Sequence, residues 1–172
     1  MSELLLVIGG TRSGKSRYAL ERARHAGRDA VTYIATARPG DPELDVRIAG
    51  HRKYRPASWR TIDAAPELAD TISSVPQRDV LLLDSITLWL SASLDEPAED
   101  VATRLGRAID AMRARRTLSI VVSDEVGLGI VPVTPAGREF RDRLGLAAQR
   151  LAREADEVVM LIAGLPLILK PR

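Results

Sequence analysis

Residues 9–16, GGTRSGKS, constrain the fold more than any other stretch, because they match the pattern G-x-x-x-x-G-K-[ST] in full. The apolar run ELLLVIG (3–9) before them is typical of a buried strand, and residues 14–27 after them have helical spacing. In this setting the glycines let the backbone curl, so that its N–H groups and the start of the helix cradle phosphate oxygens. The sequence therefore predicts a phosphate-binding loop (P-loop). The residues of this loop assigned to a nucleotide are Gly9, Gly10, Thr11, Arg12, Ser13, Gly14, Lys15 and Ser16.

Two side chains of the loop also predict where a metal ion is held. We expect Lys15 to reach the β- and γ-phosphates and Ser16 to offer its hydroxyl to Mg²⁺. A P-loop needs a carboxylate on a neighbouring strand, and Asp84 at the end of LLLD is in the right place. The alternative for Asp84 is an N-cap of the segment that follows it. Asp124, at the end of IVVSD, is a second candidate, since both strand ends are expected at the carboxyl edge of the sheet.

Further along the chain, apolar runs alternate with segments of helical period. The strands are expected at 3–9, 30–37, 79–84, 117–124 and 156–164. The helices are expected at 14–27, 68–73, 101–115 and 134–155, with a further one from about residue 43. Only residues 94–100 have the composition of a loose loop. The pattern predicts one α/β domain over residues 1–172, with a mostly parallel central sheet and helices on both faces.

Composition argues against several other classes of protein. The net charge of +2 does not favour a surface that coats nucleic acid, and the absence of cysteine excludes disulfides and thiolate metal sites. The apolar run at the start is too short for a signal peptide, and no run approaches the roughly 18 residues that span a bilayer. We therefore expect a cytoplasmic protein without a membrane span. The guanine-reading pattern NKxD does not occur, which argues against a signalling GTPase.

The stretch RIAGHRKYRP (47–56) places one of only two histidines in a cluster of cations. Nearby positive charge favours the neutral imidazole, which can act as a base, a metal ligand or a nucleophile. The alternative is an exposed histidine on a solvated basic helix face. On a helix His51 shares a face with Arg47 and with Arg55, so we expect these two cations to point inward with it. The cations around His51 are Arg47, Arg52, Lys53 and Arg55.

Taken together, these motifs resemble the bifunctional adenosylcobinamide kinase / adenosylcobinamide-phosphate guanylyltransferase family of cobalamin biosynthesis. The blocks that carry the resemblance are GGTRSGKSRYAL, YIATA, RIAGHRKYRPASWRTID, LLLDSITLWL, DEVGLGIVP and FRDRLGLAAQRLAREADEVVMLIAGLPLILK. They cover nearly the whole chain, and the histidine block with EVGLGIVP is more specific than the P-loop. Three positions depart from the family pattern. Asp124 and Ala148 stand where the family often has asparagine, and Gly50 precedes a single His51 where some members have adjacent histidines.

The resemblance implies a recombinase-like P-loop NTPase fold, a homotrimer and two reactions. In the first reaction, a nucleoside triphosphate phosphorylates the hydroxyl of the aminopropanol arm of adenosylcobinamide. In the second, GTP donates GMP to adenosylcobinamide phosphate through a GMP–histidine intermediate, giving adenosyl-GDP-cobinamide and pyrophosphate. GTP is the guanylyl donor, ATP is possible for the kinase step, and Mg²⁺ is the expected cofactor. The catalytic residues expected on this basis are His51, Lys15, Arg47 and Arg55.

Further nucleotide contacts are expected around this centre. The stretch YIATA (33–37) is expected to line the nucleotide pocket, with plain sheet core as the alternative. The resemblance suggests that Asp63 reads the guanine base, and that EVGLGIVP (125–132) faces the corrinoid or a phosphate; the alternative for that loop is a tight turn. The additional residues assigned to the nucleotide are Ile34, Ala35, Thr36, Arg52, Lys53, Tyr54, Asp63 and Asp84.

Two other functions remain open at this point. Another small-molecule P-loop kinase would keep the P-loop and the arginines but needs no nucleophilic histidine. A nucleotide-dependent regulatory or binding module could recognise nucleic acid through the basic block. That block has no interleaved stacking aromatic apart from Tyr54, which argues against nucleic acid as a partner.

Overall fold

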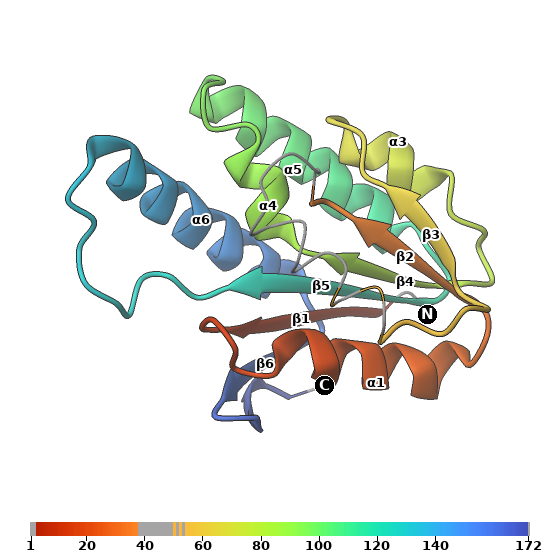
Figure 1. Ribbon diagram of the computed structural model, residues 1–172. Helices are drawn as coiled ribbons and strands as arrows, with labels where there is room; N and C mark the ends of the chain where they lie inside the picture. The colour runs from red at the N-terminus through yellow and green to blue at the C-terminus, as the bar shows by residue number, and fades with distance from the viewer. Residues whose placement is uncertain (1–2, 38–49, 51, 53, 172) are drawn as a thin grey trace.

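A seven-stranded sheet, in the order β3-β2-β4-β5-β1-β6-β7, forms the centre of the computed structural model (Figure 1). The structure describes residues 3–37, 50, 52 and 54–171. All neighbouring strands pair in parallel except β6 and β7, which are antiparallel. The strands are β1 (Glu3–Gly9), β2 (Val31–Ala35), β3 (Arg60–Asp63), β4 (Val80–Asp84), β5 (Leu118–Asp124), β6 (Glu157–Ile162) and β7 (Leu165–Lys170).

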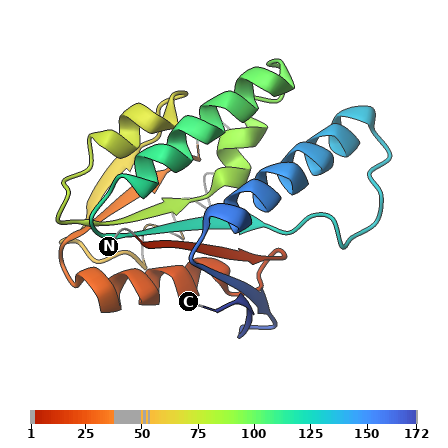
Figure 2. The same cartoon turned by 180° about the vertical axis from the view of Figure 1, so that it is seen from behind.

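Helices cover both faces of this sheet. The helices are α1 (Lys15–Gly27), α3 (Leu68–Ser73), α4 (Ile86–Ser91), α5 (Ala98–Arg113) and α6 (Pro135–Glu154). Among them α1 packs on one face, and α3, α4, α5 and α6 lie on the other, as the two opposite views show (Figures 1 and 2). None of the described helices is long and apolar enough to cross a membrane.

The central strands are buried from both sides, which explains their unbroken apolar runs. In β1, Leu4 and Leu6 pack in the core beneath α3–α6, whereas Leu5 and Val7 pack in the core beneath α1. Such two-sided burial is typical of parallel strands between helical layers. Burying one side chain of this size is worth about 1.5–3 kcal/mol relative to leaving it exposed, so both cores stabilise the same strands.

The register of the parallel strands brings their carboxyl ends to one edge of the sheet. Gly9 at the end of β1 pairs with Asp124 at the end of β5. Ala35 at the end of β2 pairs with Asp63 on one side and with Asp84 on the other. Because parallel strands end in step, three carboxylates and the start of the P-loop share this edge, where ligands bind in open α/β sheets.

The structure confirms the α/β class and the expected strands and helices to within a few residues. One boundary prediction was wrong: α5 begins at Ala98, inside the expected loop 94–100. Pro97 precedes this helix, and the acidic Glu99 and Asp100 lie in its first turn, where negative charge is favoured. The helix expected from about residue 43 begins outside the described residues.

The sequence does not predict β3, α4 or β7. All six residues of β7 and most of the four in β3 are exposed, so neither strand shows a buried apolar run. The α4 helix has six residues and follows β4 after a single residue, which is too short for a helical period to stand out. A long irregular connection follows β5 at residues 125–134, which agrees with the loop expected for EVGLGIVP (125–132) and is longer than a tight turn.

The turn between β6 and β7 supports the P-loop from the side. Ala163 and Gly164 both have positive φ, 51° and 84°, which fits a tight hairpin turn. The Gly164 N–H donates a hydrogen bond to the Ser13 carbonyl oxygen at 2.9 Å. This turn therefore holds the backbone of the P-loop in place from a distant part of the sequence.

We expect Gly164→Ala to lower the free energy of unfolding by about 1 kcal/mol, because a side chain is disfavoured at this positive φ. Gly145→Ala is the matched control, since Gly145 lies within α6 with open space around its Cα. The control should gain about 0.5–1 kcal/mol, because alanine favours helix more than glycine does. Urea denaturation of both variants gives the sign of each change in the free energy of unfolding. Equal changes in the two variants would contradict the explanation by strain in the turn.

Candidate nucleotide site

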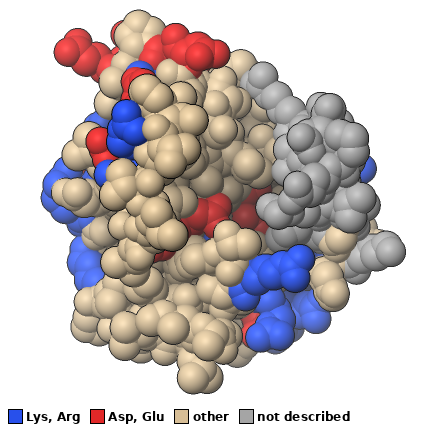
Figure 3. Space-filling view, turned by 60° about the vertical axis from the view of Figure 1, so that its left-hand side comes forward, with Lys and Arg blue, Asp and Glu red and all other residues tan. Residues whose placement is uncertain are grey.

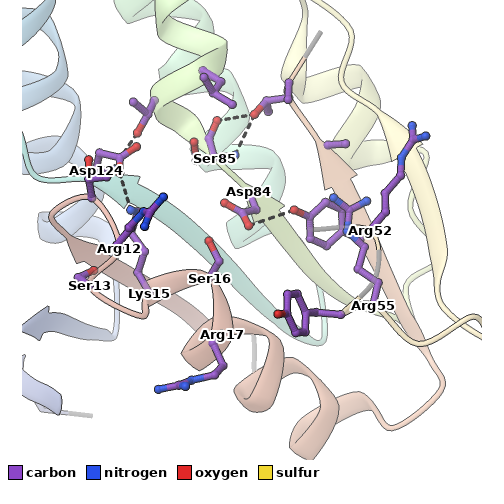
Figure 4. A pocket seen from close by; sticks show the side chains of 18 of the residues that line it. Arg12, Ser13, Lys15, Ser16, Arg17, Arg52, Arg55, Asp84, Ser85 and Asp124 are labelled. Carbon is purple, nitrogen blue, oxygen red and sulfur yellow. Dashed lines mark hydrogen bonds and ion pairs between the residues drawn. The ribbon is translucent and has the colours of Figure 1, made fainter. Parts of the chain in front are cut away.

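A cavity of about 1000 Å³ lies at the carboxyl edge of the sheet. The space-filling view shows it as a hollow with acidic atoms inside and basic atoms beside it (Figure 3). Its walls come from the P-loop, from the ends of β2, β3, β4 and β5, and from a segment just before β3 (Figure 4). The residues lining it are Thr11, Arg12, Ser13, Gly14, Lys15, Ser16, Arg17, Tyr33, Ala35, Thr36, Ala37, Arg52, Tyr54, Arg55, Asp63, Ala64, Asp84, Ser85, Thr87, Leu88, Asp124 and Val126.

Glycine is required at both ends of the P-loop. A Cβ on Gly9 would come within 2.7 Å of the Leu161 carbonyl oxygen, so no larger residue fits there. Gly14 has a φ of +96°, and it forms the N-cap of α1 without any side-chain capping bond. The first N–H groups of α1 are therefore not capped by a side chain, which is the arrangement that binds phosphate oxygens.

Lys15 extends from the first turn of α1 back over the loop. Its ammonium lies 2.5 Å from Oδ1 of Asp124 and donates to the Gly10 carbonyl oxygen at 3.2 Å. Gly9 and Gly10 do not line the cavity themselves, and Gly10 contributes through this carbonyl contact. The ion pair with Asp124 joins the P-loop to the end of β5.

Asp84 is fixed by a buried tyrosine. The Tyr33 hydroxyl donates to Oδ2 of Asp84 at 3.0 Å. Burial, and then the negative charge of Asp84, raise the pKa of Tyr33, so the phenol stays protonated and remains the donor. The guanidinium of Arg55 lies over the Tyr33 ring, 3.5 Å from its centroid, in cation–π geometry. Arg55, Tyr33 and Asp84 thus form a connected set on one wall of the cavity.

The alternative of Asp84 as a helix cap is wrong, because Ser85 occupies the N-cap position of α4. Asp84 instead lines the cavity, and in Figure 4 the Ser16 side chain points toward it. A hydroxyl and a carboxylate are hard oxygen donors of the kind that Mg²⁺ prefers. The described residues contain no group of three or more His, Cys, Asp or Glu that could hold a metal, so phosphate and water oxygens would have to complete any such site.

The end of β2 divides between core and cavity. Ile34 is fully buried in the core beneath α3–α6, so its side chain cannot line the cavity. Ala35 and Thr36 do line it. The Thr36 hydroxyl donates to the Ser85 carbonyl oxygen at 2.7 Å and accepts from the Ser85 N–H at 2.8 Å, which ties β2 to the start of α4. In YIATA, the expected lining of the pocket is therefore found at Ala35 and Thr36, and the alternative of sheet core is found at Ile34.

The basic segment contributes three described residues to the same cavity. Arg52, Tyr54 and Arg55 line it, and so does Asp63 at the end of β3. Tyr54 is 75% exposed, so its ring is open to contact from solvent. Arg47, His51 and Lys53 lie outside the described residues.

Several lining residues were not among those assigned to the nucleotide, although Tyr33 lies in the stretch YIATA that was expected to line the pocket. Tyr33, Thr87 and Leu88 come from a strand and a helix whose apolar patterns favour core. Thr87 accepts a hydrogen bond from the Asp124 N–H at 2.8 Å, so it positions the carboxylate that faces Lys15. Asp124 was expected at this edge, but no sequence signal predicts its ion pair with Lys15.

Fold and site together define a P-loop nucleotide-binding protein with a recombinase-like α/β fold. The structure is similar to flagellar accessory protein FlaH from Methanocaldococcus jannaschii, with a TM-score of 0.55 and 15% identity, covering 99% of this chain and 79% of that one. At this level of identity the likeness concerns the fold alone.

The chain belongs to the cobinamide kinase / cobinamide phosphate guanyltransferase family, whose model matches residues 5–169. It is 41% identical over 168 residues to the bifunctional adenosylcobalamin biosynthesis protein CobP of Pseudomonas aeruginosa, covering 96% of each chain. It is 36% identical over 182 residues to the protein CobU of Salmonella typhimurium, which bears the same description, covering 97% of this chain and 99% of the relative. The family resemblance deduced from the motifs is confirmed, and the chain is an enzyme of cobalamin biosynthesis.

Proposed function

We propose that this enzyme phosphorylates adenosylcobinamide with a nucleoside triphosphate and then transfers GMP from GTP to the product through a GMP–His51 intermediate. The observation that carries the proposal is the shared cavity, which has the P-loop on one side and the basic segment that contains Arg52 and Arg55 on the other. A single bound GTP could present its γ-phosphate to an acceptor at the P-loop and its α-phosphate to the basic segment.

In the kinase step, the acceptor hydroxyl oxygen attacks the γ-phosphorus, the bond to the β-phosphate oxygen breaks, and the nucleoside diphosphate leaves as the hydroxyl proton is released. The P-loop N–H groups and Lys15 hold the phosphates in line. Ser16 and Asp84 would hold Mg²⁺, which when bound neutralises charge on the phosphate oxygens. Tyr33 keeps Asp84 oriented through its hydrogen bond. GTP, or ATP in this step, is the proposed phosphoryl donor.

In the guanylyl step, a neutral nitrogen of His51 attacks the α-phosphorus and pyrophosphate leaves. A phosphate oxygen of adenosylcobinamide phosphate then attacks the same phosphorus, and the phosphorus–nitrogen bond breaks to return His51. Positive side chains stabilise the charge that builds on the phosphoryl oxygens, and losing one such contact typically costs about 100-fold or more in rate. Arg55 supports this role, since it lines the cavity and is half-buried. Arg47 is proposed to act with it, and Asp63 at the β3 end to contact the base.

We expect Asp84→Asn to raise the Mg²⁺ concentration needed for half-maximal kinase activity at least about tenfold. Losing even an outer partner of a metal ligand costs about 10- to 100-fold in metal affinity, so losing the ligand's charge should cost no less. Asp110→Asn is the matched control, because it removes the same charge from an exposed residue of α5 that does not line the cavity. Mg²⁺ titration of activity measures the effect, and an unchanged Mg²⁺ dependence in Asp84→Asn would remove Asp84 from the metal site.

We expect His51→Ala to abolish covalent labelling by α-labelled GTP and the transfer of GMP, while the kinase step survives. The kinase step needs the P-loop and the metal carboxylate but no covalent enzyme intermediate. The label on the wild-type protein should be lost in acid and persist in base, as a phosphorus–nitrogen bond does. Mass spectrometry locates the added GMP.

The control for this experiment is His25→Ala. His25 is exposed in the last turn of α1 and does not line the cavity, so this variant should keep both the label and the transfer. The proposal fails if His51→Ala still takes the label, or if it loses kinase and transferase activity equally. In the absence of a label on the wild type, a simple P-loop kinase becomes the better description.

We also propose that the enzyme is a homotrimer and that the connection 125–134 takes part in its contacts. In this connection Leu128, Ile130 and Val133 are 80%, 96% and 93% exposed. Apolar side chains grouped in this way on a surface favour association. The connection extends away from the sheet together with the start of α6 (Figure 1).

A cytoplasmic location of the enzyme remains a prediction.

Light scattering of the wild type should give the mass of three chains of 18.7 kDa each. We expect Ile130→Asp to shift this mass toward the single chain, because a charge would be buried in the contact. Leu165→Asp is the control, since Leu165 is also exposed and apolar but lies on β7. A monomeric wild type at micromolar concentration would contradict the proposal.

A further inference from the structure

The P-loop lysine already has an anionic partner within the protein. Lys15 lies 2.5 Å from Asp124, and the two side chains are only 12% and 26% exposed. The γ- and β-phosphate oxygens of a nucleotide would require the same ammonium. The carboxylate of Asp124 therefore stands where an anionic oxygen of the ligand is expected to bind.

The backbone of Asp124 is fixed on both sides. It is the last residue of β5 and pairs with Gly9 at the end of β1. Its N–H donates to the Thr87 hydroxyl at 2.8 Å, and the next N–H, of Glu125, donates to the Gly9 carbonyl oxygen at 3.0 Å. The side chain can rotate, but the residue cannot withdraw from the P-loop without breaking the sheet.

We propose that Asp124 is an internal competitor for Lys15, which a nucleoside triphosphate must displace, so that this carboxylate lowers the affinity of the enzyme for its nucleotide. The inference rests on the proposed use of the P-loop for GTP. Two effects act in the same direction. The ion pair with Lys15 is lost when the phosphates take the lysine, and the carboxylate then remains beside a polyanion.

The competition should depend on which phosphates the ligand carries. A P-loop lysine contacts the β- and γ-phosphates, so a nucleoside monophosphate does not compete for it. A divalent cation bound to the triphosphate reduces the repulsion with Asp124. The carboxylate therefore favours the metal-bound nucleotide over the free one, and its effect is largest when no metal is present.

The size of the effect follows from charge proximity. A charge within about 4–6 Å shifts an ionisation equilibrium by about one to three pKa units, which corresponds to about 10- to 1000-fold. Part of the interaction is screened, since the Asp124 side chain is partly exposed. We therefore expect the lower end of this range, about tenfold.

The test is an equilibrium titration of the full-length protein with GTP in the presence of EDTA. Asp124→Asn, which keeps the shape and removes the charge, should bind GTP about tenfold more tightly than the wild type, and Asp124→Ala should do the same. Binding of GMP should be unchanged, and the gain for GTP should shrink when Mg²⁺ is added. Thermal melts establish that each variant is folded.

Glu125→Gln is the matched control, because it removes the same charge from the neighbouring residue. The Glu125 carboxylate accepts a hydrogen bond from the Gly127 N–H at 2.6 Å and does not line the cavity. If Glu125→Gln tightens GTP binding as much as Asp124→Asn does, net charge rather than competition for Lys15 is responsible, and the inference is overturned.

Other outcomes would also overturn it. Unchanged GTP affinity in Asp124→Asn would mean that the pair with Lys15 offers no competition. Weaker binding only in the presence of Mg²⁺ would make Asp124 a metal ligand instead. If the wild type binds GTP and takes the GMP label, but Asp124→Asn binds GTP no more tightly than the wild type, this inference alone is overturned. A wild type that does not bind GTP would overturn the proposed function along with it.

Discussion

The parallel hydrogen-bond ladders between β2, β4, β5 and β1 set the position of the charged groups at the strand ends. These ladders fix the register, and the register brings Asp84, Asp124 and Gly9 to one edge. The backbones at these positions are held by the sheet, because each is the last residue of a strand buried on both faces. Charged groups so close together are tolerated because the edge is open to solvent and offers them partners of opposite sign, Lys15 among them.

A second layer of contacts makes this edge specific. Tyr33 is a core residue whose hydroxyl emerges at the cavity, and it connects Arg55 above its ring with Asp84 beyond its hydroxyl. A cation of the basic segment and the carboxylate proposed to hold the metal are thereby in contact through one aromatic side chain. Movement of the basic segment would change the surroundings of Asp84 as well as its own, so the two proposed reactions are physically coupled at this wall.

Much of the fold and part of the site could be predicted from the sequence, for identifiable reasons. The P-loop and the buried strands give strong local patterns, and Asp84 follows from its place at a strand end. Tyr33 lies in a stretch expected to line the pocket, but the hydrogen bonds that Tyr33 and Thr87 make there could not be predicted, because an apolar pattern does not distinguish a core residue from one whose hydroxyl reaches a cavity. The ion pair between Lys15 and Asp124 depends on strand order, which the sequence does not reveal. Ile34 lies next to cavity residues in sequence and was assigned to the nucleotide, but its side chain faces the core.

The hydrogen bond from Gly164 to the P-loop has a consequence for how the enzyme is made. Ribosomes synthesise a chain from its N-terminus, and local segments begin to fold as they emerge. The glycine loop of residues 9–16 is therefore made early, whereas the turn that holds its Ser13 carbonyl is made near the end of the described chain. An unfinished or truncated chain would carry the phosphate-binding motif without its support. The P-loop backbone gains this hydrogen bond only after β6 and β7 have been made, so its final support depends on completion of the sheet.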